Sequence, residues 1–402
     1  MIDKRELQLL QEALGVLEQG SDSLPDFQPG FDEGDVAGVL GEVARRMQDN
    51  FPYYHPQYAG QMLKPPHPIA RLAYALSLWV NPNNHALDGG RASSAMEKEC
   101  IVELGRLFGW EAPLGHLTAG GTMANLEALW VAGRLAPGRK LIASEMAHYT
   151  HSRISEVLGI PFAAVAVDER GRMNVADVEE QLATGDVGCV VVTVGTTGLG
   201  AADPLPEILA LRQRFEFRVH IDAAYGGYFG LASELDAETR AVYAALGEAD
   251  SIVIDPHKHG LQPYGCGCVL FRDPSVGTFY KHDSPYTYFS SGDLHLGEIT
   301  LECSRAGASA VALWATQRLL PMVPGGEFAD GLDACLRAAR SLHLELHNSS
   351  AFTPLVEPQL DIVSYAVNAA TTSEASRRAR EVFDEAAKKE LHLALIELPS
   401  EF

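Results

Sequence analysis

Short apolar runs separated by amphipathic stretches fill the middle of this chain. Seven such runs are typical of β-strands, at residues 116–119, 140–144, 162–167, 189–194, 217–221, 251–254 and 266–271. Helical patterns fill most of the gaps, for example at 122–135 and 205–215. Apolar strands that alternate with helices predict an α/β fold with a mostly parallel, seven-stranded sheet between helices. Ligands of such sheets bind beyond the carboxyl ends of the strands.

The flanking regions predict a further division of the chain. We expect an N-terminal helical segment over residues 1–60, a large domain over 61–305 and a small α+β C-terminal domain over 306–402. Proline is dense from 52 to 82, which suggests an irregular segment wrapped over a surface. Within the small domain the patterns predict helices at 307–320 and 330–347 and strands near 361–367 and 392–397.

The composition excludes several classes of function. A formal net charge of -22 argues against nucleic-acid binding, which needs a basic face. No run of about 18 apolar residues is present, and the first residues lack the apolar core of a signal peptide. We therefore expect a cytoplasmic protein without a membrane segment. Cys266 and Cys268 border an apolar strand and are interpreted as small buried residues, so no metal site is predicted.

Charged side chains follow two of the predicted strands. Asp222 ends one strand in the run HIDAAYGG, and Lys258 comes just after another in SIVIDPHKH. A charge at the end of a buried strand is costly unless it meets an opposite charge. Because desolvation activates an amine, a lysine in such a place is suited to form an imine.

Two further motifs follow neighbouring strands. In HLTAGGTMAN, residues 116–125, a strand turns on two glycines into a helix, so the free N–H groups and the positive end of that helix face the same edge. Such a turn is a ready phosphate cradle, with the Thr122 hydroxyl as a further donor. His148 places an imidazole just past the next strand. A histidine that stands alone is more often a packing residue, but here four motifs occur together.

A rival interpretation is a nicotinamide-dependent oxidoreductase. The run GLGAAD at 198–203 follows one strand, and Asp222 ends the next, which mimics a dinucleotide fingerprint with its ribose-binding acid. The third glycine is replaced by Asp203, whose charge would oppose a pyrophosphate. The pairs His148 with His151 and His257 with His259 could suggest metal ligands, but no HExxH pattern accompanies them.

In their order, the four motifs resemble those of the group II pyridoxal-phosphate (PLP) dependent amino-acid decarboxylases, of PLP fold type I, over residues from about 50 to 320. The resemblance implies that Lys258 binds PLP as a Schiff base, that Asp222 pairs with the ring nitrogen, and that His148 stacks on the ring. It also implies further contacts to the cofactor, with the last two residues reaching it across a dimer interface: Gly121, Thr122, Thr196, Ala224, His257, Ser304 and Arg305.

The resemblance also implies the reaction, which is α-decarboxylation of an L-amino acid to an amine and CO2 by a homodimer. A tyrosine on a loop after the lysine supplies a proton in that family, and Tyr286 and Tyr288 both fit. The rings of Tyr280, Tyr286, Tyr288 and Phe289 favour an aromatic, tyrosine-like substrate. An acidic substrate such as aspartate or glutamate is the alternative. It would need an arginine in the pocket. The last segment of the small domain, which family members have and which is absent here, is one place from which that arginine could come. A different PLP lyase or an aminotransferase would also fit the motifs, whereas a non-catalytic PLP-fold protein is disfavoured because the lysine and the aspartate are both present.

Overall fold

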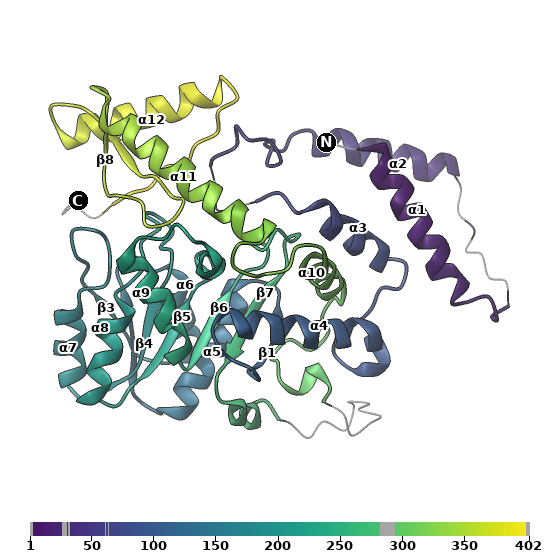
Figure 1. Ribbon diagram of the computed structural model, residues 1–402, viewed down its shortest axis with the longest axis horizontal. Helices are drawn as coiled ribbons and strands as arrows, with labels where there is room; N and C mark the ends of the chain where they lie inside the picture. The colour runs from purple at the N-terminus through teal and green to yellow at the C-terminus, as the bar shows by residue number, and fades with distance from the viewer. Residues whose placement is uncertain are drawn as a thin grey trace.

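The computed structural model describes residues 3–25, 30, 33–60, 62, 64–281 and 294–398. A seven-stranded sheet between helices forms its centre, a small helical unit lies over one end, and the first two helices extend away from the body (Figure 1). Within these ranges no helix is long and apolar enough to cross a membrane.

The sheet confirms the predicted fold class. Its strands run in the order β1-β7-β6-β5-β4-β2-β3, and β7 is antiparallel to both of its neighbours while the remaining pairs are parallel. Each predicted run overlaps one of the strands, which are β1 (Leu114–Thr118), β2 (Lys140–Ser144), β3 (Phe162–Val165), β4 (Val187–Thr193), β5 (Arg218–Asp222), β6 (Ser251–Ile254) and β7 (Gly267–Phe271).

Both faces of the sheet are covered by helices. In β4, Val190 and Val192 belong to one hydrophobic cluster, whereas Cys189 and Val191 belong to another. The first cluster includes side chains of α8 (Leu205–Ala210) and α9 (Ala237–Ala245), and the second those of α5 (Gly121–Leu135) and α6 (Thr150–Leu158). This burial on two sides explains why the strands are continuous apolar runs. The helices around the sheet are α4 (Leu87–Leu107), α5 (Gly121–Leu135), α6 (Thr150–Leu158), α7 (Val175–Ala183), α8 (Leu205–Ala210), α9 (Ala237–Ala245) and α10 (Ala308–Leu319).

The C-terminal part contains two helices and a two-stranded ribbon. These are α11 (Glu327–His347), α12 (Thr372–Ala387), β8 (Phe352–Pro354) and β9 (Tyr365–Val367). The strand predicted near 392–397 is wrong. That run makes a single bridge, between His392 and Tyr58, and Leu395 and Ile396 are exposed. An apolar run needs a sheet to continue as a strand, and here its neighbour is the irregular segment near Tyr58.

The N-terminal part differs from the expectation in one place. α1 (Lys4–Gln19) and α2 (Glu33–Met47) are helices without a buried residue. The proline-dense segment is not irregular throughout, because α3 (Pro68–Ser77) lies within it. Pro68 is tolerated at the start of α3, where its missing N–H has no helical partner in any case. The His67 ring also caps the helix by accepting a hydrogen bond from Ile69 N.

Candidate active site

A cavity of about 510 Å³ lies beyond the carboxyl ends of the parallel strands. This volume is typical of a site for a small molecule or cofactor. The cavity brings together seven of the predicted site residues, which come from the segments after β1, β2, β5 and β6: Gly121, Thr122, His148, Asp222, Ala224, His257 and Lys258.

The turn between β1 and α5 has the form of a phosphate cradle. Gly120 has φ of 151°, in a region that favours glycine, and α5 begins at Gly121. Two close approaches exclude a larger side chain: a Cβ on Gly121 would lie 2.7 Å from Asp255 Oδ2, and one on Gly267 would lie 2.5 Å from the carbonyl carbon of Gly120. The first residues of α5, Gly121 to Met123, line the cavity, and because the first N–H groups of a helix have no partner within it, an anion fits there.

Asp222 is buried and held by two hydrogen bonds. Its Oδ2 lies 2.9 Å from His151 Nε2, and its Oδ1 accepts from Ala224 N at 3.1 Å. Burial by itself raises the pKa of Asp222, but the hydrogen bond from His151, the charge of Lys258 and the hydrogen bond from Ala224 N together outweigh it. The pKa of Asp222 therefore lies well below its usual range, and the group is a carboxylate at neutral pH.

Lys258 faces a second buried acid, Asp255, which is not among the predicted site residues. Lys258 Nζ lies 3.2 Å from Asp255 Oδ2, and His257 Nε2 lies 3.6 Å from the same oxygen. Burial raises the pKa of Asp255 by more than the charges of Lys258 and His257 lower it. The sequence contains a signal that could have identified Asp255 as a site residue, because this acid directly follows β6 and precedes the lysine by three residues.

His148 lines the cavity and is oriented by its own turn. Its Nδ1 accepts a hydrogen bond from Thr150 N at 3.2 Å and also lies beside the Thr150 hydroxyl. Burial lowers the pKa of His148, with a smaller opposite effect of Asp222. With Nδ1 as an acceptor, the ring proton is on Nε2.

Some predicted site residues do not line the cavity. The Thr196 hydroxyl accepts from Ala201 N inside its own turn, and Thr197, the next residue, lines the cavity instead. Ser304 is exposed and accepts from Asn83 Nδ2. Tyr286 and Tyr288 lie outside the described residues.

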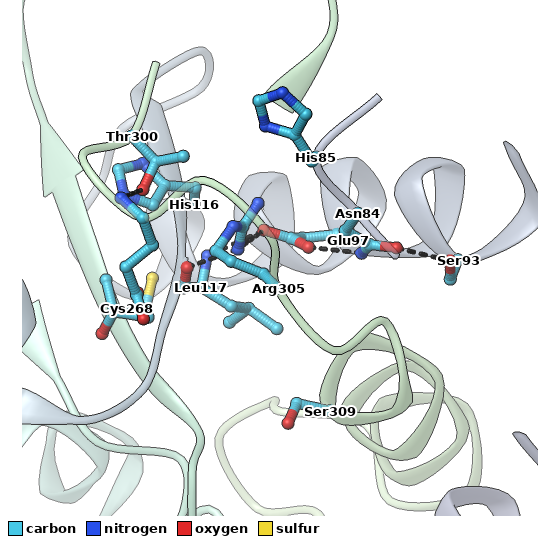
Figure 2. A network of polar contacts seen from close by, with 12 residues as sticks. Asn84, His85, Ser93, Glu97, His116, Leu117, Cys268, Thr300, Arg305 and Ser309 are labelled. Carbon is cyan, nitrogen blue, oxygen red and sulfur yellow. Dashed lines mark hydrogen bonds and ion pairs between the residues drawn. The ribbon is translucent and has the colours of Figure 1, made fainter. Parts of the chain in front are cut away.

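The Arg305 side chain makes its contacts within its own chain through one nitrogen, Nη1. Its Nη1 lies 2.8 Å from Glu97 Oε1 and donates to the carbonyl oxygen of Leu117 at 2.5 Å. Figure 2 shows these contacts continuing from Glu97 to Asn84 and Ser93. Glu97 also accepts from Leu117 N, so this ion pair satisfies both backbone groups of one residue on the edge strand β1. Contact of Ser304 and Arg305 with a partner's cofactor stays a prediction.

The same edge is held further along by Glu302, whose Oε2 accepts from Ala119 N at 3.1 Å. Leu117 and Ala119 are two residues apart and therefore present their backbone groups to the same side. Side chains of the segment at 302–305 thus support the end of β1 immediately before the glycine turn.

A buried polar cluster reaches the cavity through Tyr225. Tyr225 lines the cavity, and its hydroxyl donates to Asp361 Oδ1 at 2.6 Å. Asp361 Oδ2 lies 3.1 Å from both His259 Nε2 and Lys64 Nζ. Tyr280, by contrast, is not a pocket ring: it is buried among side chains that include Trp130.

Comparison with known sequences decides the family. Residues 130–368 match the profile of the pyridoxal-dependent decarboxylase conserved domain. The chain belongs to this family. The decarboxylase is 31% identical to a probable L-tyrosine/L-aspartate decarboxylase of Methanothermobacter thermautotrophicus, over 76% of this chain and 82% of that one. It is 30% identical to an L-aspartate decarboxylase of Thermococcus kodakarensis, over 81% of this chain and 83% of that one. It is 26% identical to an L-tyrosine decarboxylase of Enterococcus faecium, over 87% of this chain and 74% of that one.

Solved structures confirm the fold of the decarboxylase. Mouse CSAD superposes with a TM-score of 0.82 at 23% sequence identity, with 100% of this chain and 86% of that one covered. Oryza sativa TDC superposes with a TM-score of 0.81 at 16% identity, with 99% and 92% covered. The oxidoreductase interpretation is excluded by the family, and Asp203 has a structural role: its carboxylate accepts from the backbone N–H groups of Met173 and Thr193.

The cofactor of the decarboxylase is PLP, and the residues of the cavity fit it. The open helix end of α5 suits a phosphate, the Lys258 amine suits an aldehyde, and the Asp222 carboxylate suits a protonated ring nitrogen. The cavity therefore offers one matching group for each polar end of the cofactor.

Proposed function

We propose that this decarboxylase removes the α-carboxylate of an aromatic, tyrosine-like L-amino acid and releases the amine and CO2. The observation that carries the substrate class is the lining of the cavity. Within the described ranges no arginine lines it, and its lining includes the rings of Tyr225 and Tyr264 and the apolar side chains of Met62, Met123 and Leu126. Such a surface suits a ring better than a second carboxylate.

An acidic substrate would need a cation that is free to bind its side chain. Lys64 follows Met62 by two residues, but its charge is already paired with Asp361. Relatives named for aspartate, for tyrosine and for both support either class, so the lining of the cavity decides our choice.

The proposed roles follow from the position of each side chain. The Lys258 amine binds the cofactor aldehyde, the α5 turn at Gly121 and Thr122 with His257 binds the phosphate, and His148 and Ala224 contact the ring. Asp222 keeps the ring nitrogen protonated. Bound PLP supplies an electron sink for bond breaking at Cα.

Residues of the chain then position the Lys258 amine and supply the proton that Cα needs. Asp255 holds the Lys258 amine within the cavity, with Lys258 Nζ 3.2 Å from Asp255 Oδ2. Loss of CO2 leaves an electron pair at Cα that must gain one proton to give the amine. Tyr286 or Tyr288 stays our prediction for the donor of that proton.

We also propose that the decarboxylase is a cytoplasmic homodimer with active sites at the interface. The exposed apolar side chains of α1 and α2, among them Leu9, Val39 and Leu40, support a partner surface in the N-terminal segment. Analytical ultracentrifugation of the active protein should give twice the chain mass, and an active monomer would contradict the proposal.

The substrate is tested by a CO2-release screen of the common L-amino acids, with the amine product identified by mass spectrometry. We expect release from tyrosine and related aromatic amino acids, and none from a Lys258→Ala variant used as the control. Release from aspartate or glutamate alone would reject the aromatic assignment. Formation of an aldehyde or keto acid without the amine would reject the proposed reaction.

A further inference from the structure

His151 contacts Asp222 but does not itself line the cavity. It is the second residue of α6, and its side chain is 1% exposed. His148 precedes it by three residues and lies before the start of α6, whereas His151 is within the helix. The two imidazoles therefore reach the site differently: His148 lines the cavity, whereas His151 contacts the carboxylate of Asp222.

The hydrogen bonds of His151 indicate which nitrogen carries its proton. Nε2 lies 2.9 Å from the ionised carboxylate of Asp222, so this nitrogen must donate. Nδ1 is buried and has no hydrogen-bond partner in the part of the chain that the structure describes. A proton on Nδ1 would be a buried donor without an acceptor, which is costly, so the geometry favours the Nε2–H tautomer.

The two donors to Asp222 also fix the direction of its carboxylate. His151 occupies Oδ2 and Ala224 N occupies Oδ1, one donor on each oxygen. A carboxylate accepts about four hydrogen bonds, so lone pairs remain for a donor in the cavity that Asp222 lines.

We propose that His151 is a positioning residue of the decarboxylase, which holds Asp222 ionised and in the rotation that meets the ring nitrogen of the cofactor. The inference rests on the role proposed for Asp222. It adds a residue that touches neither cofactor nor substrate and that acts only through Asp222.

Three variants test the proposal in the full-length protein. His151→Phe keeps a ring but removes the donor, His151→Gln keeps an N–H near the position of Nε2, and Ser155→Ala is the matched control. Ser155 is a buried residue of α6, one turn further on, that donates to the His151 carbonyl oxygen and does not line the cavity.

Loss of a hydrogen bond to a charged group predicts a reduction of kcat by about 10- to 100-fold in His151→Phe, with KM nearly unchanged. His151→Gln should recover most of this loss, and Ser155→Ala should stay within about twofold of the wild type. Fluorescence titration of the apoprotein should show the weakest PLP binding in His151→Phe, intermediate binding in His151→Gln and nearly unchanged binding in Ser155→Ala.

A readout independent of turnover comes from NMR of the apoprotein labelled with 15N-histidine. We expect His151 to show a protonated Nε2 and an unprotonated Nδ1, and the Nε2–H signal to shift in Asp222→Asn. A proton on Nδ1 instead would overturn the proposal. This measurement needs no variant of His151 to fold.

The variants also separate this inference from the proposed function. If His151→Phe retains full kcat and PLP affinity while Asp222→Asn loses turnover, the role of His151 is rejected and that of Asp222 stands. If Asp222→Asn retains turnover as well, the role of Asp222 itself is rejected, and the inference fails with it.

Discussion

Replacing Arg305 with methionine would leave Glu97 as a buried carboxylate without its cationic partner. The side chains of the pair are 7% and 1% exposed. Removing one partner of a buried ion pair costs about 3–5 kcal/mol of folding free energy. Glu97 retains hydrogen bonds from Asn84 Nδ2 at 2.6 Å and from Leu117 N at 2.9 Å, which favours the lower end of this range. We therefore expect a loss of about 3 kcal/mol.

The measurement is urea unfolding of Arg305→Met, of Glu97→Gln and of the double variant. Arg305→Met leaves the charge of Glu97 unpaired, and Glu97→Gln removes that charge. The double variant should therefore lose about 1–3 kcal/mol less stability than the two single variants lose in sum. Because the pair supports β1 just before the glycine turn, PLP should also bind about tenfold more weakly to Arg305→Met, or about 1.4 kcal/mol.

Arg337→Met is the matched control. Arg337 pairs with Glu234 on the surface, where the side chains are 56% and 35% exposed. Such a pair contributes about 0–1 kcal/mol. If Arg305→Met loses no more stability than Arg337→Met, or if the effects in the double variant are additive, our account of the β1 edge is refuted.

Other predictions address the cofactor site directly. Borohydride reduction of the yellow holoprotein should fix PLP to Lys258, as peptide mass mapping will show; a label on another lysine would contradict the assignment. Asp222→Asn should still bind PLP covalently, seen by absorbance, while kcat falls by about 100-fold or more because the charge at the ring nitrogen is lost. Gly267→Ala should raise the PLP dissociation constant by about tenfold or more, since its Cβ would press on Gly120; unchanged affinity would show that the turn yields freely. Removing PLP should lower the melting temperature in calorimetry, because a ligand at 100 times its Kd stabilises by about 2.7 kcal/mol.

Much of the fold could be predicted because the strands are buried on both sides. All four residues of β6, Ser251–Ile254, are buried, and three of them are apolar, so the run stands out as a strand. Its predicted and observed bounds agree. Because ligands of parallel sheets bind at the carboxyl ends of the strands, the sequence also predicts Asp222, Lys258 and His148 at one edge. Their assembly in one cavity follows from the topology alone.

The parts that could not be predicted depend on side-chain direction and on distant contacts. Thr196 and Thr197 are adjacent, and only the backbone of the turn decides which one faces the cavity. The long side chain of Arg305 could point to a partner or into its own chain, and no periodic pattern distinguishes these. The partnership of Lys64 with Asp361 spans 297 residues, which leaves no local signal in the sequence.

The Asp361 cluster has a consequence for how the protein is made. Tyr225 belongs to the cavity wall, but the acid that holds its hydroxyl is 136 residues further along the chain. At about 5–20 residues per second, a ribosome needs roughly 7 to 27 seconds to add that length. During this time the central strands can fold, while Tyr225 in the cavity wall and its neighbour His259 lack the acceptor for their hydrogen bonds. A nascent chain therefore cannot complete its cofactor pocket before Asp361 leaves the ribosome, and covalent capture of PLP should be a late event in biosynthesis.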